Sequence, residues 1–454
     1  MFRRNFLKLP AVMLMGWLTK PQTAPAGAVA PNKQRIVVIG AGLAGLAAAR
    51  ELQAQGHTVM VVEGRDRIGG RIWTSTQWPA MPIDLGASWI HGRKGNPLTN
   101  LARAAQTKLL VTQYDSSITY NTAGKPLSDA EEARLEKWQD QLFDALAEAQ
   151  TADRDTSIRQ VAETLFAQMD RSPQARRFLN FIVSGNMEQE YGGSADQLSA
   201  YWYDSAKAFP GDDVLFASGF RVIPEYLARG LEIELGQVVK EIHWRQSPVR
   251  VVTDKAEFTA DQVLVTLPLG VLQAGRVRFT PALPAVKQTA IAKLGMGVLN
   301  KCYLRFAQPF WPTDVDWLEY IPASHGEWTE WVSLQRVAKL PILLGFNAAE
   351  RGRQIEAWSD QRIVASAMQT LKTIYGHSIP DPLDYQITRW AADPFALGSY
   401  SFNPVGATPA MRRALAKPLQ NQLFFAGEAT ERDYFGTAHG AYLSGLRAAK
   451  EMMA

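Results

Sequence analysis

Three glycines and one acid near the start of the chain have the types and spacing needed to hold a dinucleotide. Gly40, Gly42 and Gly45 form a Gly-x-Gly-x-x-Gly segment, and Glu63 follows the next apolar run. In such a segment the first glycine permits a tight turn, the second lets the backbone approach a pyrophosphate, and the third lets a helix pack closely on a strand. The carboxylate of Glu63 is placed to accept a hydrogen bond from a ribose hydroxyl. The pattern therefore predicts a dinucleotide-binding turn.

The elements predicted around this turn are those that a dinucleotide site requires. Residues 35–39 form an apolar, β-branched run that predicts a strand, and the alanine-rich segment after the turn predicts a helix. A helix that begins at the turn directs its N-terminus at the phosphates. Residues 58–62 form a second apolar run that ends immediately before Glu63. No second segment of this kind follows, so the sequence predicts one dinucleotide, either a nicotinamide or a flavin.

Three further segments favour the flavin. Gly69-Gly70-Arg71 places flexible backbone and a guanidinium just after the second strand, which suits a second approach to a pyrophosphate. Residues 423–430 predict a short buried strand that leads into Gly427-Glu428, and residues 434–445 predict a loop followed by a helix. Together these segments resemble the flavin-containing amine oxidase family, and within it the polyamine oxidases and the flavin lysine demethylases, which are related to monoamine oxidase.

The resemblance extends from about residue 35 to residue 450 and rests on several separate motifs. They are the Gly40–Gly45 turn, Gly69-Gly70-Arg71, Leu85-Gly86-Ala87-Ser88-Trp89-Ile90-His91-Gly92, Thr266-Leu267-Pro268-Leu269-Gly270, Asn300-Lys301, Trp390 with Asp393-Pro394, Gly398-Ser399-Tyr400-Ser401, and Gly427-Glu428. The resemblance implies an α/β fold. It consists of a discontinuous Rossmann-type FAD-binding domain and an α+β substrate domain with a mixed sheet and a helical insertion.

The cofactor motifs lie at both ends and in the middle of the chain, so the FAD-binding domain must be discontinuous. We expect it to comprise residues 33–95, 217–289 and 385–450, and we expect residues 96–216 and 290–384 to form the substrate-binding domain.

The two insertions differ in their patterns. In the first, Ser128 and Glu131 form a capping box before an apolar stripe that continues to residue 149, so this part is predicted to be mainly helical. The second insertion predicts strands, most clearly at residues 303–306 and 328–334, and then a helix near residues 360–375.

Lys301 is the first candidate for a catalytic residue. Alternation along residues 300–306 sends Lys301, Tyr303 and Arg305 to one face of the predicted strand. In the family, the lysine that matches Lys301 holds a water near the flavin N5 atom. A cation at that place would stabilise reduced flavin and developing superoxide.

Three other residues complete the amine site that the resemblance implies. Tyr400 matches an aromatic residue that walls the amine pocket, and aromatic faces attract cations. Thr437 stands where monoamine oxidases have a second tyrosine, a departure that opens the pocket. His91 resembles a histidine near the substrate of animal polyamine oxidases, and histidine can exchange protons near neutral pH.

The same resemblance implies which residues contact the cofactor. They are Gly40, Gly42, Leu43, Ala44, Gly45, Glu63, Gly70, Arg71, Gly86, Ala87, Ser88, Trp89, Val239, Trp390, Gly427, Glu428, Thr437 and Ala438. Ser399 stands where monoamine oxidases have a cysteine that bonds to the flavin, and the only cysteine of this chain is Cys302. We therefore expect non-covalent FAD.

The implied reaction is oxidation of a primary or secondary, polyamine-like amine to an imine. Water would hydrolyse the imine to an aldehyde, and oxygen would be reduced to hydrogen peroxide. One alternative is an L-amino-acid oxidase of the same fold, which needs an arginine clamp for a carboxylate; Arg305 and Arg389 are present, but the sequence does not place them. Another is a flavin-bound, non-catalytic interaction protein.

Two acids of the helical insertion have two possible roles. Glu188 and Glu190 would line a cation path or form a solvated face.

The first thirty residues predict targeting rather than structure. Arg3-Arg4-Asn5-Phe6-Leu7-Lys8 resembles the twin-arginine export signal and precedes an apolar stretch too short to span a bilayer. We therefore expect the twin-arginine export machinery as a partner and a periplasmic or secreted location.

Residues 1–30 hold four basic side chains and no acid, so without them the 48 basic residues fall to 44, equal to the 44 acidic residues. This charge balance predicts no nucleic-acid binding. The sequence has no cysteine and histidine residues at the spacing of a zinc site, so we also expect no metal binding.

Overall fold

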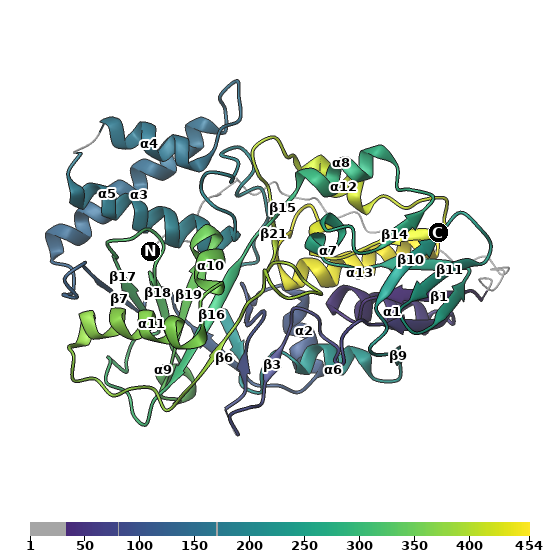
Figure 1. The fold of residues 1–454 in the computed structure, drawn as a ribbon, viewed down its shortest axis with the longest axis horizontal. Helices are drawn as coiled ribbons and strands as arrows, with labels where there is room; N and C mark the ends of the chain where they lie inside the picture. The colour runs from purple at the N-terminus through teal and green to yellow at the C-terminus, as the bar shows by residue number, and fades with distance from the viewer. Residues whose placement is uncertain (1–32, 80, 169–170) are drawn as a thin grey trace, which may run out of the picture.

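The computed structural model describes residues 33–79, 81–168 and 171–454, and the expected export segment lies outside them. One half of the molecule is built on a five-stranded parallel sheet (Figure 1). Its strands, in spatial order, are β22 (Leu423–Phe425), β13 (Gln262–Val265), β1 (Arg35–Ile39), β2 (Thr58–Val62) and β9 (Glu232–Glu234). Three separate stretches of the chain therefore contribute to one sheet.

Strand β1 is buried on both faces, which explains its uninterrupted apolar run. Ile36 and Val38 belong to the cluster formed with helices α1 (Leu43–Ala54) and α13 (Ala438–Met452). Val37 and Ile39 point to the opposite face. There they pack with a four-stranded sheet of β12 (Glu257–Ala260), β11 (Val249–Thr253), β10 (Val239–His243) and β14 (Arg278–Thr280), and with helices α8 (Ala285–Lys293) and α12 (Pro409–Ala416).

The other half contains a six-stranded mixed sheet. Its order is β20 (Asp384–Ile387), β16 (Leu299–Arg305), β19 (Ile342–Ala348), β18 (Glu330–Ser333), β17 (Trp317–Tyr320) and β7 (Ser117–Tyr120). Every pairing is antiparallel except that of β17 with β7. The predicted α/β class, with a parallel sheet and a second mixed sheet, is confirmed.

Strand β16 has an interior place in this sheet, and its side chains alternate as predicted. Cys302 and Leu304 join the cluster under helix α11 (Asp360–Tyr375), whereas Tyr303 joins the cluster on the opposite face. Helix α11 has the bounds that the sequence predicted. The predicted strand 328–334 is shorter, because Trp328 has a φ of 51° and Leu334 begins helix α9 (Leu334–Ala338).

A helical insertion covers one end of the six-stranded sheet (Figure 1). It consists of α3 (Asp129–Ala149), α4 (Ile158–Gln168), α5 (Pro173–Val183) and the π-helical turn η1 (Ser184–Gln189). The predicted capping box is present, since the backbone N–H of Ser128 donates to Glu131 Oε2 at 3.0 Å. The predicted apolar stripe is buried at Trp138, Leu142 and Leu146.

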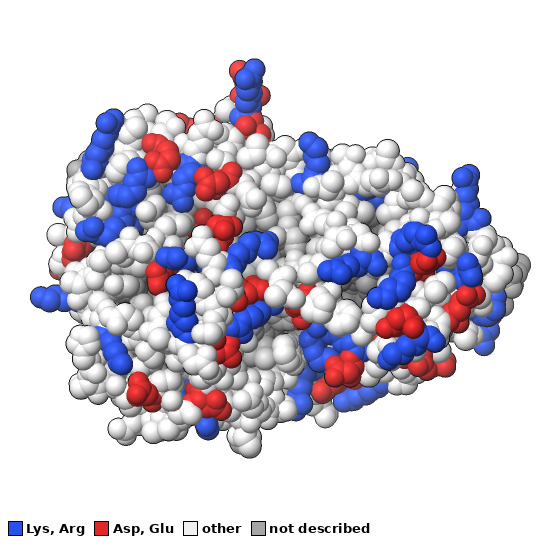
Figure 2. Space-filling view, in the orientation of Figure 1, with Lys and Arg blue, Asp and Glu red and all other residues white. Residues whose placement is uncertain are grey.

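The remaining elements of the described residues are shorter. They are β3 (Thr74–Ser75), β4 (Ile83–Asp84), β5 (Trp89–Ile90), α2 (Pro97–Ala104), β6 (Leu109–Thr112), β8 (Asp213–Phe216), α6 (Val222–Ala228), α7 (Leu269–Gln273), β15 (Gly295–Met296), α10 (Ala349–Glu356), β21 (Ser401–Phe402) and η2 (Glu428–Thr430). No helix within the described ranges is both long enough and apolar enough to cross a membrane. Positive and negative side chains are interspersed over the face shown in Figure 2.

Candidate active site

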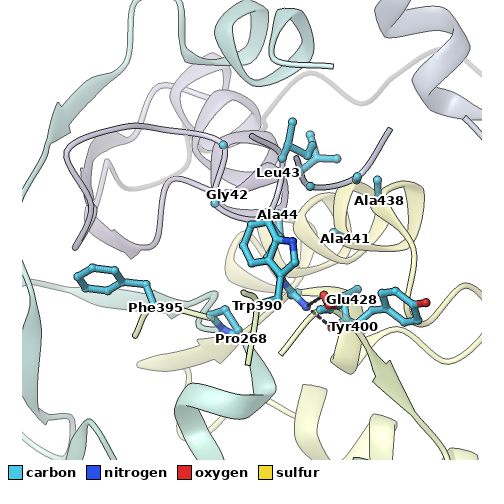
Figure 3. A pocket seen from close by; sticks show the side chains of 18 of the residues that line it. Gly42, Leu43, Ala44, Pro268, Trp390, Phe395, Tyr400, Glu428, Ala438 and Ala441 are labelled. Carbon is cyan, nitrogen blue, oxygen red and sulfur yellow. Dashed lines mark hydrogen bonds and ion pairs between the residues drawn. The ribbon is translucent and has the colours of Figure 1, made fainter. Parts of the chain in front are cut away.

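One cavity of about 600 Å³ is lined by residues of both halves. Figure 3 shows Gly42, Leu43 and Ala44 at the start of α1, together with Trp390 and Tyr400, which line the same cavity. The glycine turn of the parallel sheet and the face of the mixed sheet that carries Lys301 therefore border a single space.

The glycine turn has the form of a phosphate site. Gly40 has a φ of +106°, which glycine adopts without strain. A Cβ atom added at Gly42 would meet no protein atom within 4 Å, although Gly42 lines the cavity, so its backbone is open to a ligand. Helix α1 has no side-chain cap and no acid in its first turn, which leaves its N-terminal N–H groups for an anion.

Glu63 and Gly45 complete the turn in different ways. The Glu63 carboxylate lines the cavity and accepts hydrogen bonds from the backbone N–H groups of Ala41 and Arg65, each at 2.8 Å. Gly45 does not line the cavity. A Cβ atom at this position would sit 2.0 Å from the carbonyl oxygen of Gly40, so only glycine fits there. Gly45 thus allows α1 to start tightly against the turn, as its sequence position predicted, and does not border the ligand space.

All the other predicted cofactor residues line this cavity. They are Gly40, Gly42, Leu43, Ala44, Glu63, Gly70, Arg71, Gly86, Ala87, Ser88, Trp89, Val239, Trp390, Gly427, Glu428, Thr437 and Ala438. The turn, the helix N-terminus and the cavity lined by both halves suit a flavin dinucleotide, whose pyrophosphate would lie at α1.

A buried ion pair connects two of the cofactor motifs. Arg71 Nη1 lies 2.9 Å from Glu428 Oε1 and also donates to the carbonyl oxygen of Ser399 at 2.9 Å. Burial alone would raise the pKa of Glu428. The charge of Arg71 and the hydrogen bond from Ser401 Oγ outweigh it and hold the pKa below its usual 4.5. Glu428 is therefore a carboxylate that fixes Arg71 beside the cavity.

Lys301 is buried, only 5% exposed, and its ammonium group is surrounded by acceptors. Nζ donates to the carbonyl oxygens of Asp84 at 2.8 Å and Gly86 at 2.7 Å, and to Ser88 Oγ. Burial lowers the pKa of Lys301 from 10.5 to about 7, while the nearby Asp84 carboxylate opposes this shift. Lys301 lines the cavity and does not lie on an exposed edge strand. A water held by Lys301 would take the place of one of these three contacts.

Tyr400 and Thr437 also line the cavity. The Tyr400 hydroxyl donates to the carbonyl oxygen of Gln189 in η1 at 2.6 Å, which ties its ring to the helical insertion. Burial raises the pKa of Tyr400 well above its usual value, so the phenol stays neutral. Thr437 is the N-cap of α13: its hydroxyl accepts from Gly440 N at 2.9 Å and donates to Tyr434 O at 2.7 Å.

His91 follows strand β5 and lines the cavity beside Trp89, on which its ring stacks at 6.4 Å between centroids. Its Nδ1 lies 2.7 Å from Asp213 Oδ2. The four predicted catalytic residues therefore border one space, although they come from four distant parts of the chain.

The sequence did not reveal an aromatic wall in the same cavity. Trp317 stacks on Tyr114 at 4.6 Å and on Trp89 at 6.2 Å between ring centroids, and Phe346 lies 6.3 Å from Trp317. All four rings line the cavity. Phe346 pairs in register with Lys301 across strands β19 and β16, so only the strand order would have identified it.

Two acids also line the cavity. Glu330, on β18, is 3% exposed, and Glu190 follows η1. Both acids lie close enough to Tyr400 to contribute to its raised pKa. Glu188 has a different place: it is buried outside the cavity lining, with Oε2 2.7 Å from His325 Nε2.

The arginines considered for a carboxylate clamp lie outside the cavity lining. Arg389 pairs with Asp360 at 2.6 Å, and the Arg305 guanidinium lies over the ring of Trp78. Within the part of the chain that the structure describes, no group of three or more His, Cys, Asp or Glu side chains is arranged to hold a metal ion.

The fold and the site together define a dinucleotide-binding oxidoreductase in which a second domain borders the cofactor cavity. The model of a family described as flavin containing amine oxidoreductase matches residues 43–453, and the chain belongs to this family. It is thus an oxidoreductase acting on CH–NH or CH–NH2 donors.

Relatives agree with this assignment, and a solved structure shares the fold. The chain is 34% identical over 435 residues to Polyamine oxidase 2 of Arabidopsis thaliana, covering 92% of this chain and 87% of the relative. It is also 34% identical to Lysine-specific histone demethylase 1 homolog 2 of Arabidopsis thaliana, of which it covers 58%. A structure of putrescine oxidase bound to putrescine has the same fold, with a TM-score of 0.77, 20% identity, and coverage of 93% of this chain and 99% of that chain.

Proposed function

We propose that the protein is an FAD-dependent oxidase of polyamine-like amines. It converts a primary or secondary amine to an imine that water hydrolyses to an aldehyde, while oxygen is reduced to hydrogen peroxide. The observation that carries this proposal is the lining of one cavity by Lys301, an aromatic wall and two carboxylates.

The cavity lining suits a flexible cation with more than one amino group. The faces of Trp89, Tyr114 and Trp317 attract ammonium groups and pack against methylene chains. Glu190 and Glu330 supply negative charge for an amino group that is not being oxidised. A carboxylate-bearing substrate would instead be repelled by these acids, which disfavours the L-amino-acid oxidase alternative.

The residues of the chain have distinct parts in this reaction. FAD, when bound, accepts the hydride equivalent from the carbon beside nitrogen and passes the electrons to oxygen. The α1 turn, Glu63 and Arg71 would hold the dinucleotide. Tyr400 and the aromatic wall orient the amine and exclude water, and the Lys301 ammonium group donates hydrogen bonds where negative charge develops.

FAD is proposed to bind without a covalent bond. Cys302 faces the cluster under α11 and does not line the cavity. The hydroxyl of Ser399 is occupied by hydrogen bonds to the backbone of Leu299. Acid precipitation should therefore release all the flavin, and flavin retained on the precipitated chain would contradict this proposal.

A substrate panel tests the proposed function. Putrescine, spermidine, spermine, tyramine and L-amino acids are each mixed with the purified holoenzyme, and peroxide formation is measured. The polyamines should bleach the visible flavin bands without oxygen and should produce peroxide with oxygen. Preference for an L-amino acid would support the alternative enzyme, and a flavin that no substrate bleaches would support a non-catalytic protein.

Export by the twin-arginine route to the periplasm, or secretion, is proposed from residues 1–30 alone. That route is understood to carry folded proteins, which suits a chain that must close over its cofactor.

A further inference from the structure

A buried carboxylate from a distant strand holds the ring of His91. Asp213 Oδ2 lies 2.7 Å from His91 Nδ1, and the side chains are 5% and 32% exposed, respectively. The two residues are 122 positions apart. They meet because β5 pairs with β8, with Ile90 opposite Val214.

The Asp213 carboxylate is oriented by two contacts. Its Oδ1 accepts the backbone N–H of Gly92 at 2.7 Å, which directs Oδ2 at His91. A carboxylate has only acceptor oxygens, so His91 Nδ1 must carry the proton in this contact. In the neutral ring the lone pair is therefore on Nε2.

The surroundings fix the ring as well as its tautomer. Trp89 stacks on His91, and the Trp89 indole N–H donates to Thr112 Oγ1 at 3.1 Å. The Thr112 hydroxyl in turn donates to the carbonyl oxygen of Asp213 at 3.2 Å. One set of contacts thus connects Asp213 with both the edge and the face of the imidazole.

Other charged and titratable groups lie in the turns and helices next to His91 or line the same cavity. They are Arg93, Lys94 and Asp212 in the adjoining turns, His439 beside Asn96, and Arg71, Tyr114, Glu190, Lys301, Glu330, Tyr400 and Glu428 in the cavity lining. Arg93 pairs with Asp212 at 2.8 Å, and Lys301 is bound by Asp84, Gly86 and Ser88. Asp213 makes a direct hydrogen bond with the imidazole ring.

We propose that Asp213 is a positioning residue that sets His91 Nε2 as the proton acceptor for the ammonium group of an incoming amine. One N–H bond of the ammonium breaks, a new N–H bond forms at Nε2, and the electron pair stays on the amine nitrogen. The resulting imidazolium is stabilised by Asp213 and returns its proton to water through its exposed part. This step rests on the proposed function, since it requires an amine in the cavity.

The variant Asp213→Asn gives a sharp test because it replaces one acceptor oxygen by a donor. The backbone N–H of Gly92 still requires an oxygen, so the amide NH2 faces His91 Nδ1. The tautomer should then reverse, with the proton on Nε2 and no acceptor for the substrate.

Nitrogen-15 NMR of the histidine-labelled holoenzyme reads the tautomer without turnover. At a pH where the ring is neutral, wild-type His91 should be protonated at Nδ1, with its signals assigned by their loss in His91→Gln. Asp213→Asn should shift the proton to Nε2. The control is Glu241→Gln, which makes the same chemical change at the His243–Glu241 pair, 3.0 Å apart, and should leave the His91 signals unchanged.

The rate constant for anaerobic flavin reduction tests the proton transfer itself. Asp213→Asn should lower it by roughly 10- to 100-fold where the amine is cationic. The loss should shrink as the pH rises toward the pKa of the amine, about 10.4 for an alkylammonium, because a neutral amine needs no acceptor. A structural defect would instead lower the rate equally at every pH.

Each outcome decides the proposal. Reversal of the tautomer together with a pH-dependent loss supports it. The proposal is overturned if wild-type His91 is protonated at Nε2, or if the loss in the rate of flavin reduction is independent of pH. If the variant does not fold, the wild-type spectrum alone decides. If no amine reduces the wild-type flavin, the proposed function fails and the proton transfer fails with it, whereas the NMR result still tests the control of His91 by Asp213.

Discussion

Replacing Lys301 by methionine should leave the fold and the flavin in place and slow the chemistry. Methionine keeps the length of the side chain and its packing near the rings of Trp89 and Tyr303, which lie 5.7 and 5.9 Å from Nζ. The substitution therefore removes the ammonium group and little else.

The expected loss of stability is small because the contacts of the ammonium group are partly replaced. Asp84 O still accepts from the Tyr303 hydroxyl at 2.8 Å, and Gly86 O is 3.3 Å from Ser88 Oγ. About one acceptor loses its donor, at a cost of about 1–3 kcal/mol. The variant also no longer buries a cation, the desolvation of which lowers the pKa of Lys301 to about 7. The two effects oppose each other, so we expect the free energy of unfolding to change by less than about 2 kcal/mol.

The expected loss of activity is much larger. Removing one preorganised donor from a site where charge develops costs about 10²- to 10³-fold in rate. Stopped-flow measurement of anaerobic flavin reduction, followed by reoxidation with oxygen, shows which half-reaction carries this loss. Flavin content and thermal unfolding are measured on the same samples.

Lys287 provides a matched control. It is also buried, 1% exposed, and its Nζ donates to the carbonyl oxygens of Ala414, Leu415 and Lys417 at the end of α12. It does not line the cavity, so Lys287→Met should affect stability without slowing either half-reaction. Unchanged rates in Lys301→Met, or an equal slowing in both variants, would refute a specific role for Lys301.

Three further predictions concern stability, specificity and location. Burial lowers the pKa of Lys287 from 10.5 to about 7 in the folded protein. Between pH 7 and pH 10.5 the unfolded chain therefore binds more protons than the folded one, so this lysine makes the free energy of unfolding rise with pH. Urea denaturation at pH 7 and 9 should show a smaller rise for Lys287→Met than for the wild type. Glu330→Gln should raise the KM for putrescine roughly 10-fold or more and change the KM for a monoamine little. If steady-state kinetics show the same increase in KM for both substrates, Glu330 does not bind a second ammonium group. Replacing Arg3 and Arg4 by lysine should keep the protein in the cytoplasm, as cell fractionation would show, whereas unchanged export would exclude the twin-arginine route.

The dinucleotide turn could be predicted because its signals are local. The left-handed backbone at Gly40, the close contact at Gly45 and the uninterrupted apolar run of β1 all depend on residues near one another in sequence. The bounds of α11 and the capping box of α3 were predicted for the same reason. Strand 328–334 was predicted too long, because the sequence carries no signal for the positive φ of Trp328.

The sequence by itself determined the phosphate-binding turn, the alternation that puts Lys301 and Tyr303 on one face, and, through motifs, the family. The tertiary structure alone decided that Asp213 meets His91, that Phe346 lies beside Lys301, and that Glu330 faces the same cavity as Tyr400. The physical reason is that local backbone conformation follows from neighbouring residues. A cavity instead forms where strand order and sheet packing bring distant side chains together, and no short segment encodes that order.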